Sequence, residues 1–270
     1  MRVAVGRAKL PGPVIADLVS WNVNSLRARL PRVLELLAEH RPDVLALQET
    51  KCGPDDFPAA ELATAGYRCT THGNGHWAGV GLCLRADLEL DEVRRGLPGE
   101  PAPAQARWVE AEVEGVRVIS VYVPNGQAVG SPAFADKLAF LRAAAARLGE
   151  LAGAPLVLLG DLNVAPADVD VYDPDAFVGA THVTIAERAG LNALLATGLR
   201  DGYRVLHPDE PGFTWWDYRQ GHFHRGLGMR IDLALLSEGL ADRLESCQID
   251  RGYRKGQRPS DHAPLLVALH

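Results

Sequence analysis

The sequence has few cysteines, no long hydrophobic run and no excess of positive charge, and each absence excludes a class of protein. Its 270 residues contain no apolar stretch of the roughly 20 residues that a membrane-spanning helix needs. Residues 1–13 lack the apolar core of a secretory signal, so we expect a short N-terminal extension ahead of one domain over residues 14–270. We therefore expect a cytoplasmic protein with no membrane partner.

The cysteines are scattered along the chain, with no CxxC pair among Cys52, Cys69, Cys83 and Cys247. Zinc sites and disulfide scaffolds usually show close, repeated cysteine spacings. We therefore predict reduced thiols, as in most cytosolic proteins, and neither a zinc site nor a disulfide scaffold.

The formal net charge is −6 at pH 7, the wrong sign for a protein that coats itself with nucleic acid. A local basic face is still compatible with this total, because carboxylates elsewhere, including any around a metal, lower the sum. The hydrophobic fraction of 47% and the charged fraction of 23% are ordinary for a globular chain and exclude disorder and fibres.

Short apolar runs, many of them β-branched, alternate with segments whose apolar residues recur at helical spacing. The strands predicted from these runs cover residues 14–21, 44–48, 79–85, 116–123, 156–160 and 231–237. Helices are predicted over residues 32–40, 133–152 and 184–197, the last opening with the capping-box pair Thr184 and Glu187. Residues 96–103, rich in proline and glycine, are a predicted loop. No linker or repeat divides the chain, which favours one α/β domain.

Several predicted strands run directly into polar residues: Asn22, Glu49, Asn125 and Asp161. Any one of them alone is explained as a turn former. Together they indicate that strand ends meet at one rim and present acids and amides to a common cleft.

These residue types suit a hard cation and phosphate chemistry. Oxygen ligands from carboxylates and amides are those that Mg²⁺ prefers, although Glu49 alone would equally form a salt bridge with Lys51. Asp161 and Asn163 lie two residues apart, so in an extended segment both point the same way, unless the pair is simply an Asx-turn. Side chains of neighbouring residues usually diverge, so Asp232 rather than the adjacent Asp261 is the candidate to orient His262.

A set of motifs carries a family resemblance. In chain order they are Trp21–Arg29 (WNVNSLRAR), Leu47–Lys51 (LQETK), Tyr122–Asn125 (YVPN), Gly160–Pro166 (GDLNVAP), Arg230–Leu233 (RIDL) and Ser260–Pro264 (SDHAP). From about Val14 to the C-terminus the chain closely resembles bacterial exonuclease III and the abasic-site endonucleases of the endonuclease/exonuclease/phosphatase superfamily. The motifs are weak singly, but their number and order make the resemblance specific.

The resemblance implies a fold, a cofactor and residue roles. The fold would be a four-layer αββα sandwich of the DNase I type. Mg²⁺ would be the cofactor, with Mn²⁺ able to substitute, and Glu49 would be its main ligand. The further metal-site residues would be Asn22, Asp161, Asn163 and Asp261, with Asn24 in the same pocket. Tyr122 and Asn163 would hold the scissile phosphate, Asp161 would align or deprotonate the attacking water, and Asp232 would orient His262 against the phosphate. Either Asp161 or His262 would be the general base, and one or two metal ions would serve.

The resemblance also implies a substrate, duplex DNA with abasic sites or 3′ ends, cut by a monomer. The cut would fall 5′ to the abasic site, with 3′→5′ exonuclease activity beside it and 3′-phosphatase activity left open. Trp215, Met229 and Ile231 would line a pocket for a flipped-out sugar that lacks its base. Phosphate contacts are expected from Arg27, Arg29, Asn125, Arg251, Arg254, Lys255 and Arg258, with Arg94 and Arg95 as further candidates. The sequence leaves Trp77 undecided between the core and the DNA groove.

Two other functions fit part of the pattern. An inositol-polyphosphate phosphatase or a sphingomyelinase would use the same Glu, Asp-x-Asn and Asp-His chemistry, but the motifs at residues 21–29, 47–51 and 215–216 resemble the DNA-repair branch. A catalytically inactive DNA-binding module would need a lost catalytic residue, and each candidate position carries a competent side chain.

Overall fold

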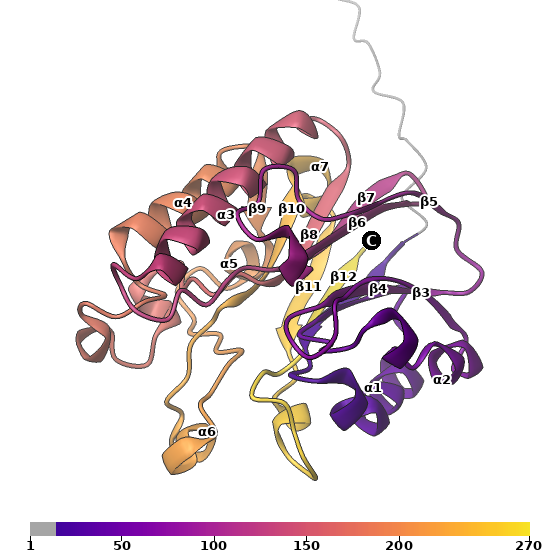
Figure 1. Ribbon diagram of the computed structural model, residues 1–270, viewed down its shortest axis with the longest axis horizontal. Helices are drawn as coiled ribbons and strands as arrows, with labels where there is room; N and C mark the ends of the chain where they lie inside the picture. Colours follow the sequence, from indigo (N-terminus) through magenta and orange to yellow (C-terminus); the bar gives the residue numbers. More distant parts are fainter. Residues whose placement is uncertain (1–14) are drawn as a thin grey trace, which may run out of the picture.

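The structure, a computed structural model, describes residues 15–270, so the extension expected over residues 1–13 lies outside the described residues. Two mixed β-sheets pack face to face, and helices cover both outer faces (Figure 1). The four-layer αββα sandwich implied by the resemblance is confirmed.

Each sheet has six strands and contains one parallel pair, β1–β2 or β7–β8; the other neighbours are antiparallel. The first sheet has the order β11 (Leu244–Ile249), β12 (Leu265–Leu269), β1 (Asp17–Asn22), β2 (Val44–Gln48), β4 (Val80–Arg85) and β3 (Tyr67–His72). The second has the order β5 (Leu90–Arg95), β6 (Trp108–Val113), β7 (Val116–Tyr122), β8 (Leu156–Asp161), β10 (Asp232–Ser237) and β9 (Leu199–Asp201).

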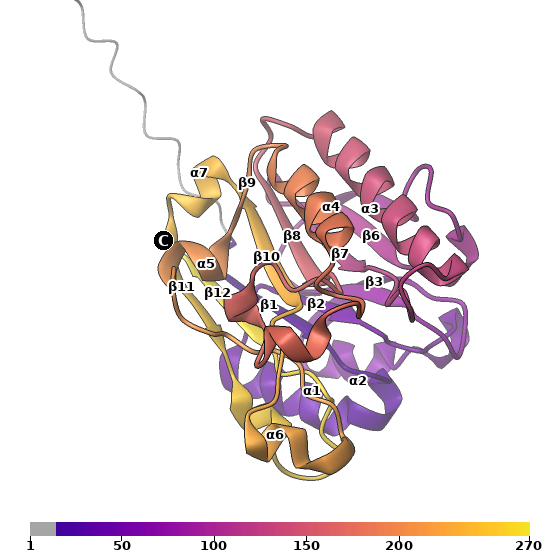
Figure 2. The same cartoon turned by 90° about the vertical axis from the view of Figure 1, so that its left-hand side faces the viewer.

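The helices lie on opposite sides of the sheet pair, as the two views in Figures 1 and 2 show. The first sheet is covered by α1 (Leu26–His40) and α2 (Ala59–Thr64), the second by α3 (Pro132–Glu150) and α4 (Ile185–Leu195). The short helices are α5 (Gly202–Leu206), α6 (His222–Arg225) and α7 (Glu238–Ala241). None of the helices within residues 15–270 is both long and apolar enough to cross a membrane.

The β2 strand shows how the layers form. Val44 and Ala46 belong to the core between the sheets, whereas Leu45 and Leu47 pack in the core under α1. Side chains alternate between the two faces of a strand, and both faces of β2 are covered. Its sequence is therefore apolar throughout, instead of alternating with polar residues.

Strands β1, β2, β4, β7, β8 and β10 match the predicted strands, whereas β3, β5, β6, β9, β11 and β12 were not predicted. The missed β5 lies at a sheet edge and is largely exposed, so it lacks the apolar run that marks a buried strand. The first helix begins at Leu26, ahead of the predicted start, and carries Pro31 within it. The predicted capping box is confirmed at α4, where Thr184 Oγ1 accepts from the Glu187 backbone.

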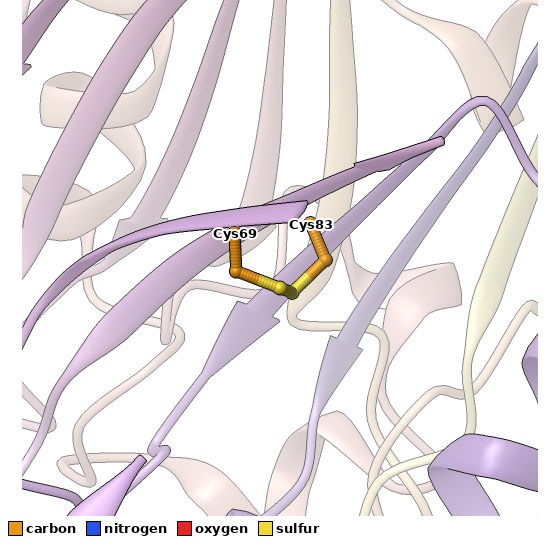
Figure 3. The surroundings of a disulfide bond; sticks show 2 residues. All are labelled: Cys69 and Cys83. Atoms are coloured by element: carbon orange, nitrogen blue, oxygen red, sulfur yellow. A yellow bond between two sulfur atoms is a disulfide. The ribbon is translucent and has the colours of Figure 1, made fainter. Parts of the chain in front are cut away.

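The prediction of reduced thiols is wrong for one pair. Cys69 in β3 and Cys83 in β4 are direct partners across the antiparallel ladder and form a disulfide (Figure 3). Fourteen positions separate them in sequence, so only the strand register brings them together. Cys52 and Cys247 are free and buried.

Candidate active site

Strand ends from both sheets converge at one edge of the sandwich. Asn22 ends β1, and Glu49 follows β2, the parallel neighbour of β1. Asp161 ends β8 and pairs in register with Asp232, which begins the antiparallel β10. His262 lies just before β12, which runs antiparallel to β1. The strand ends that the sequence predicted to meet therefore do meet, at one edge of the sandwich.

An acidic cluster spans the two sheets. Ligand atoms of Glu49, Asp161 and His262 all lie within 4.8 Å of one another. Asn22 links the sheets because its Nδ2 donates to Glu49 Oε1 at 3.0 Å and to Asp161 Oδ2 at 2.9 Å. Lys51 Nζ lies 2.9 Å from Glu49 Oε2, so the salt bridge considered for Glu49 exists within the cluster.

Left-handed backbone is concentrated here. The φ angle is 43° at Asn24, 48° at Glu49, 50° at Lys51 and 51° at Asn163. Such conformations cost on the order of 1–3 kcal/mol each outside glycine, and they persist only where neighbouring structure enforces them. Bonds from Ser25 N to Glu49 O at 2.8 Å and from Lys51 N to Ala78 O at 2.9 Å supply that enforcement.

Asp232 and His262 form the predicted pair. His262 Nδ1 lies 2.8 Å from Asp232 Oδ2, and both side chains are almost fully buried. Ser260 fixes the preceding turn because its Oγ accepts from His262 N and donates to Asn22 O. His262 Nε2 is thereby directed at Asp161, 3.7 Å from its Oδ2.

Burial and neighbouring charges shift the protonation of this cluster. Burial disfavours a charged His262, but Asp232 and Asp161 outweigh it and raise the pKa of the imidazole to about 10. Burial, opposed by His262 and reinforced by Asp232 and Glu49, raises the pKa of Asp161 to about 7. Burial also works against the Glu49 carboxylate, yet the Asn22 hydrogen bond and Lys51 lower its pKa. The result is a proton-holding imidazole beside two acids of different strength.

Asp261 is linked to this cluster indirectly, through hydrogen bonds of other side chains. Its Oδ1 accepts from Asn24 Nδ2 at 3.0 Å and its Oδ2 from Trp215 Nε1 at 3.1 Å. Asn24 in turn accepts from Lys51 Nζ at 2.6 Å. Asp261 therefore connects with Glu49 through Asn24 and Lys51.

Tyr122 and two asparagines border the cluster on the side of the second sheet. Burial, followed by the nearby Glu49 and Asp161 carboxylates, raises the pKa of Tyr122 well above its ordinary value, so the phenol keeps its proton. Asn163 Nδ2 donates to Val123 O at 3.0 Å, and its backbone N donates to Asp161 Oδ1 at 2.9 Å. Asn125 Nδ2 lies 3.4 Å from Asn163 Oδ1.

Trp215, Met229 and Ile231 lie together in one apolar cluster. Trp215 pairs with Met229 and with His262 through isolated β-bridges, which places the cluster beside the acidic site. Met229 and Ile231 are only 1% and 3% exposed, so of these three residues only the partly exposed Trp215 offers surface to a ligand. Their role as an abasic pocket stays a prediction.

The predicted phosphate contacts fall into exposed and internal groups. Exposed are Arg27, Asn125, Arg251, Lys255 and Arg258 and, on β5, Arg94 and Arg95. Arg29 is partly buried and donates to Asn24 O and Tyr218 OH. Arg254 is only 6% exposed and donates to the backbone oxygens of Ser260 and Trp216, so it braces the loop from inside. The segment of residues 251–258 lies beside α6 (Figure 2). The Arg251 guanidinium lies 5.2 Å from the Trp216 ring centre and 5.5 Å from that of Phe223 in α6.

Some site residues carried no sequence signal or an ambiguous one. Trp77 is 81% exposed, on the loop whose Ala78 O accepts from Lys51 N, so it is not a core residue. Arg107 stacks 4.6 Å from the Tyr122 ring centre. His182 Nδ1 lies 2.6 Å from Asn163 O, and burial together with Lys137 lowers the pKa of its ring to about 4. His182 and Lys137 lie outside the motifs, so only the fold connects them with the site.

The cluster fits a hard divalent cation. Glu49 and Asp161 place carboxylate oxygens close together, with Lys51 the only cation salt-bridged to Glu49 within the described residues. Oxygen donors of this kind, at the edge of a buried sheet pair, suit a metal that also holds water and a substrate phosphate.

Comparison with known proteins agrees with this geometry. Residues 19–262 match the Endonuclease/Exonuclease/phosphatase family. Exodeoxyribonuclease III of Haemophilus influenzae is 32% identical over 267 aligned residues, covering 92% of this chain and 97% of that protein. The DNA repair nuclease APEX1 of Danio rerio is 31% identical, covering 93% of this chain and 81% of that protein.

The fold is also that of a solved structure, the 3′ phosphatase NExo from Neisseria bound to a product DNA hairpin. The TM-score is 0.91 at 42% identity, with 94% of this chain and 99% of that chain covered. The family match includes every residue of the acidic cluster and ends at residue 262, before β12. The chain therefore belongs to the endonuclease/exonuclease/phosphatase family, in the branch of exonuclease III and the abasic-site endonucleases.

Proposed function

We propose that this chain is a Mg²⁺-dependent DNA-repair phosphodiesterase that hydrolyses the bond 5′ to abasic sites in duplex DNA and trims 3′ ends. The observation that carries the proposal is the cluster of Glu49, Asp161 and His262, braced by Asn22 and Asp232. Relatives described as an exodeoxyribonuclease and a DNA repair nuclease support it, as does a structural neighbour described as a 3′ phosphatase.

Glu49 and Asp161 would hold the metal, with Asn22, Asn163 and Asp261 around them. Bound Mg²⁺ would supply positive charge to the phosphoryl oxygens of the transition state. Asn22 directs its Nδ2 at both carboxylates, so its contribution is to fix the spacing of those two ligands across the sheets.

The chain's own residues and solvent water account for the proton movements. Asp161 orients the attacking water and takes its proton as the water oxygen forms its bond to phosphorus. The bond from phosphorus to the 3′ oxygen breaks, and that oxygen takes a proton from solvent water to become a 3′-hydroxyl opposite a 5′-deoxyribose phosphate. Asp161 then releases the proton of the attacking water to solvent. His262 Nε2 is free to donate to a phosphoryl oxygen because Asp232 engages Nδ1. The protonated Tyr122 is a second donor, and such fixed donors lower the barrier where charge develops.

The rim of the site would bind the DNA. Trp215 would pack against the extruded sugar, backed by Met229 and Ile231. The exposed Trp77 would stack on or wedge into the duplex, and Lys255 and Arg258 would contact phosphates without reading sequence. All of these residues come from one chain, which supports a monomeric enzyme formed by residues 14–270.

The test is incubation of purified protein with a labelled duplex that carries one abasic-site analogue, with Mg²⁺ or with EDTA, beside an undamaged blunt duplex. We expect a metal-dependent cut on the 5′ side of the lesion and a shortening ladder from the undamaged 3′ end. No cut of either duplex by folded protein in Mg²⁺ would refute the proposal. Phosphoinositide and lipid phosphodiesters would then be the next substrates to assay.

A further inference from the structure

Lys137 lies inside the molecule with its charge directed at the active-site loops. It is on α3, its side chain is fully buried, and its only salt-bridge partner among the described residues is the equally buried Glu187 of α4. Buried ion pairs contribute little net stability, because desolvation offsets much of the attraction. Retaining one here calls for an explanation beyond the core.

The ammonium reaches more acceptors than an isolated ion pair needs. Besides Glu187, Nζ lies 2.6 Å from Asn163 O, 3.2 Å from Asn125 O and 3.3 Å from Thr181 Oγ1. Lysine has three protons to donate, so these four acceptors occupy all of them. Two of the acceptors are backbone carbonyls of the asparagines that border the acidic cluster.

Neither of those asparagines is held in place by the hydrogen bonds of a β-strand. Asn125 and Asn163 lie beyond the ends of β7 and β8, and Asn163 has a left-handed φ of 51°. The orientation of the Asn163 carbonyl is set by two donors, Lys137 Nζ and His182 Nδ1, each 2.6 Å away. A carbonyl only accepts, so His182 carries its proton on Nδ1 and presents Nε2 to Asn125 Nδ2, 3.5 Å away.

The Asn125 loop is shaped to close on Lys137. At Gly126, where φ is 88°, an added Cβ would lie 2.9 Å from Lys137 Cδ and 3.1 Å from Thr181 Oγ1. The loop therefore packs directly on the lysine stem. Asn125 Oδ1 accepts from Gln127 N at 3.0 Å, which leaves Nδ2 directed at Asn163 and His182.

We propose that Lys137 is a positioning residue of the active site: it joins the loops after β7 and β8 to α4 and so sets the Asn125 and Asn163 amides for the phosphate. Lys137 touches no substrate, and it acts through those two residues. The proposal rests on the proposed phosphodiesterase function for its kinetic test, and it has a structural test that does not.

The kinetic test compares Lys137→Met with Glu187→Gln on an abasic-site duplex in Mg²⁺, with rates corrected for the folded fraction. Lys137→Met removes the donor to both carbonyls, and a displacement of about 1 Å costs roughly 100-fold in rate. We expect kcat to fall about 10- to 100-fold with KM within threefold. Glu187→Gln keeps the lysine donor to both carbonyls but breaks its ion pair with α4, so we expect a smaller loss of kcat than in Lys137→Met.

The double variant Lys137→Met/Glu187→Gln removes the unpaired buried charge and keeps the test valid if Lys137→Met unfolds. Arg147→Met is the matched control, since Arg147 also lies on α3, pairs with the buried Glu110 and bonds to no site residue. If Lys137 had only a structural role, Lys137→Met and Arg147→Met would each lose kcat in proportion to the fall in their melting temperatures. That outcome, or a wild-type kcat in the folded double variant, overturns the proposal.

A crystal structure of the folded variant separates this proposal from the proposed function. We expect the Asn163 carbonyl to rotate and the Asn125 Nδ2 to Asn163 Oδ1 separation to leave its 3.4 Å value. We expect this structural change even if the wild-type protein cuts no abasic duplex. Such a failure to cut would refute the proposed phosphodiesterase function and not the positioning role of Lys137. Unchanged Asn125 and Asn163 positions would overturn the positioning role.

Discussion

The floor of the site, formed by Asn22, Glu49, Asp161, Asp232 and His262, lies at strand ends, whereas its rim, formed by Trp77, Trp215, Lys255 and Arg258, lies on loops. Floor residues are largely buried and bonded to one another across two sheets. Rim residues are mostly exposed, and Trp77 is the extreme at 81%. Strand ends fixed by two ladders give the accuracy that chemistry needs, and loops give surface that fits a long ligand. Floor variants should therefore change kcat, and rim variants should change KM.

The largest effect is expected at Glu49. Glu49→Ala should lower Mg²⁺-dependent cleavage by roughly 1,000-fold or more, because charge neutralisation by a metal is worth several kcal/mol in the transition state. Affinity for DNA should stay within about threefold, measured by fluorescence anisotropy. Asp136→Ala, an exposed carboxylate on α3, is the control. Full activity of the Glu49 variant would remove this residue from the metal site.

Next comes His262. His262→Asn should slow cleavage by about 100- to 1,000-fold, the usual range for loss of one fixed donor that stabilises charge in the transition state, with little change in KM. Single-turnover kinetics and circular dichroism would separate lost chemistry from lost folding. His207, a partly buried histidine near Cys247, gives the comparison variant His207→Asn. Equal losses in the two variants would argue against a special role for His262.

At the rim, Trp77→Ala should raise KM about tenfold and leave kcat within about threefold. Stacking of an aromatic ring on a base is worth about 1–3 kcal/mol by alanine substitution. Steady-state kinetics on the abasic duplex provide the measurement, and Trp77→Phe should retain most of the affinity. A fall in kcat with KM unchanged would assign Trp77 to the floor instead.

The smallest effect is expected in the basic segment of residues 251–258, where Lys255 and its neighbour Arg254 should behave differently. Lys255→Ala should weaken DNA binding severalfold and reduce the slope of log affinity against log salt by about 1, as expected for one lost phosphate contact. Arg254→Ala should instead lower the melting temperature and leave that slope unchanged, because Arg254 bonds to Ser260 and Trp216 inside the loop. Titrations at several salt concentrations would decide, and an equal loss of slope in both variants would contradict the contrast.

The sequence alone predicted the strand ends of the floor, the α4 capping box and the pairing of Asp232 with His262. Each has a local signal: an apolar run ending in a polar residue, a Thr-to-Glu spacing, or a motif matched in order. It also gave the family, because six short motifs kept their order along the whole chain.

What the sequence did not contain was the set of contacts between segments far apart in the chain. The register of β3 against β4 makes a disulfide of Cys69 and Cys83, and folding of residues 251–258 against α6 turns Arg254 inward. Lys137 and His182 carry no motif, and they meet Asn125 and Asn163 only because α3 and the loop before α4 pack over the ends of β7 and β8. Local patterns depend on the periodicity of one segment, whereas these contacts depend on how two sheets and their helices close around each other, so the tertiary structure alone decided them.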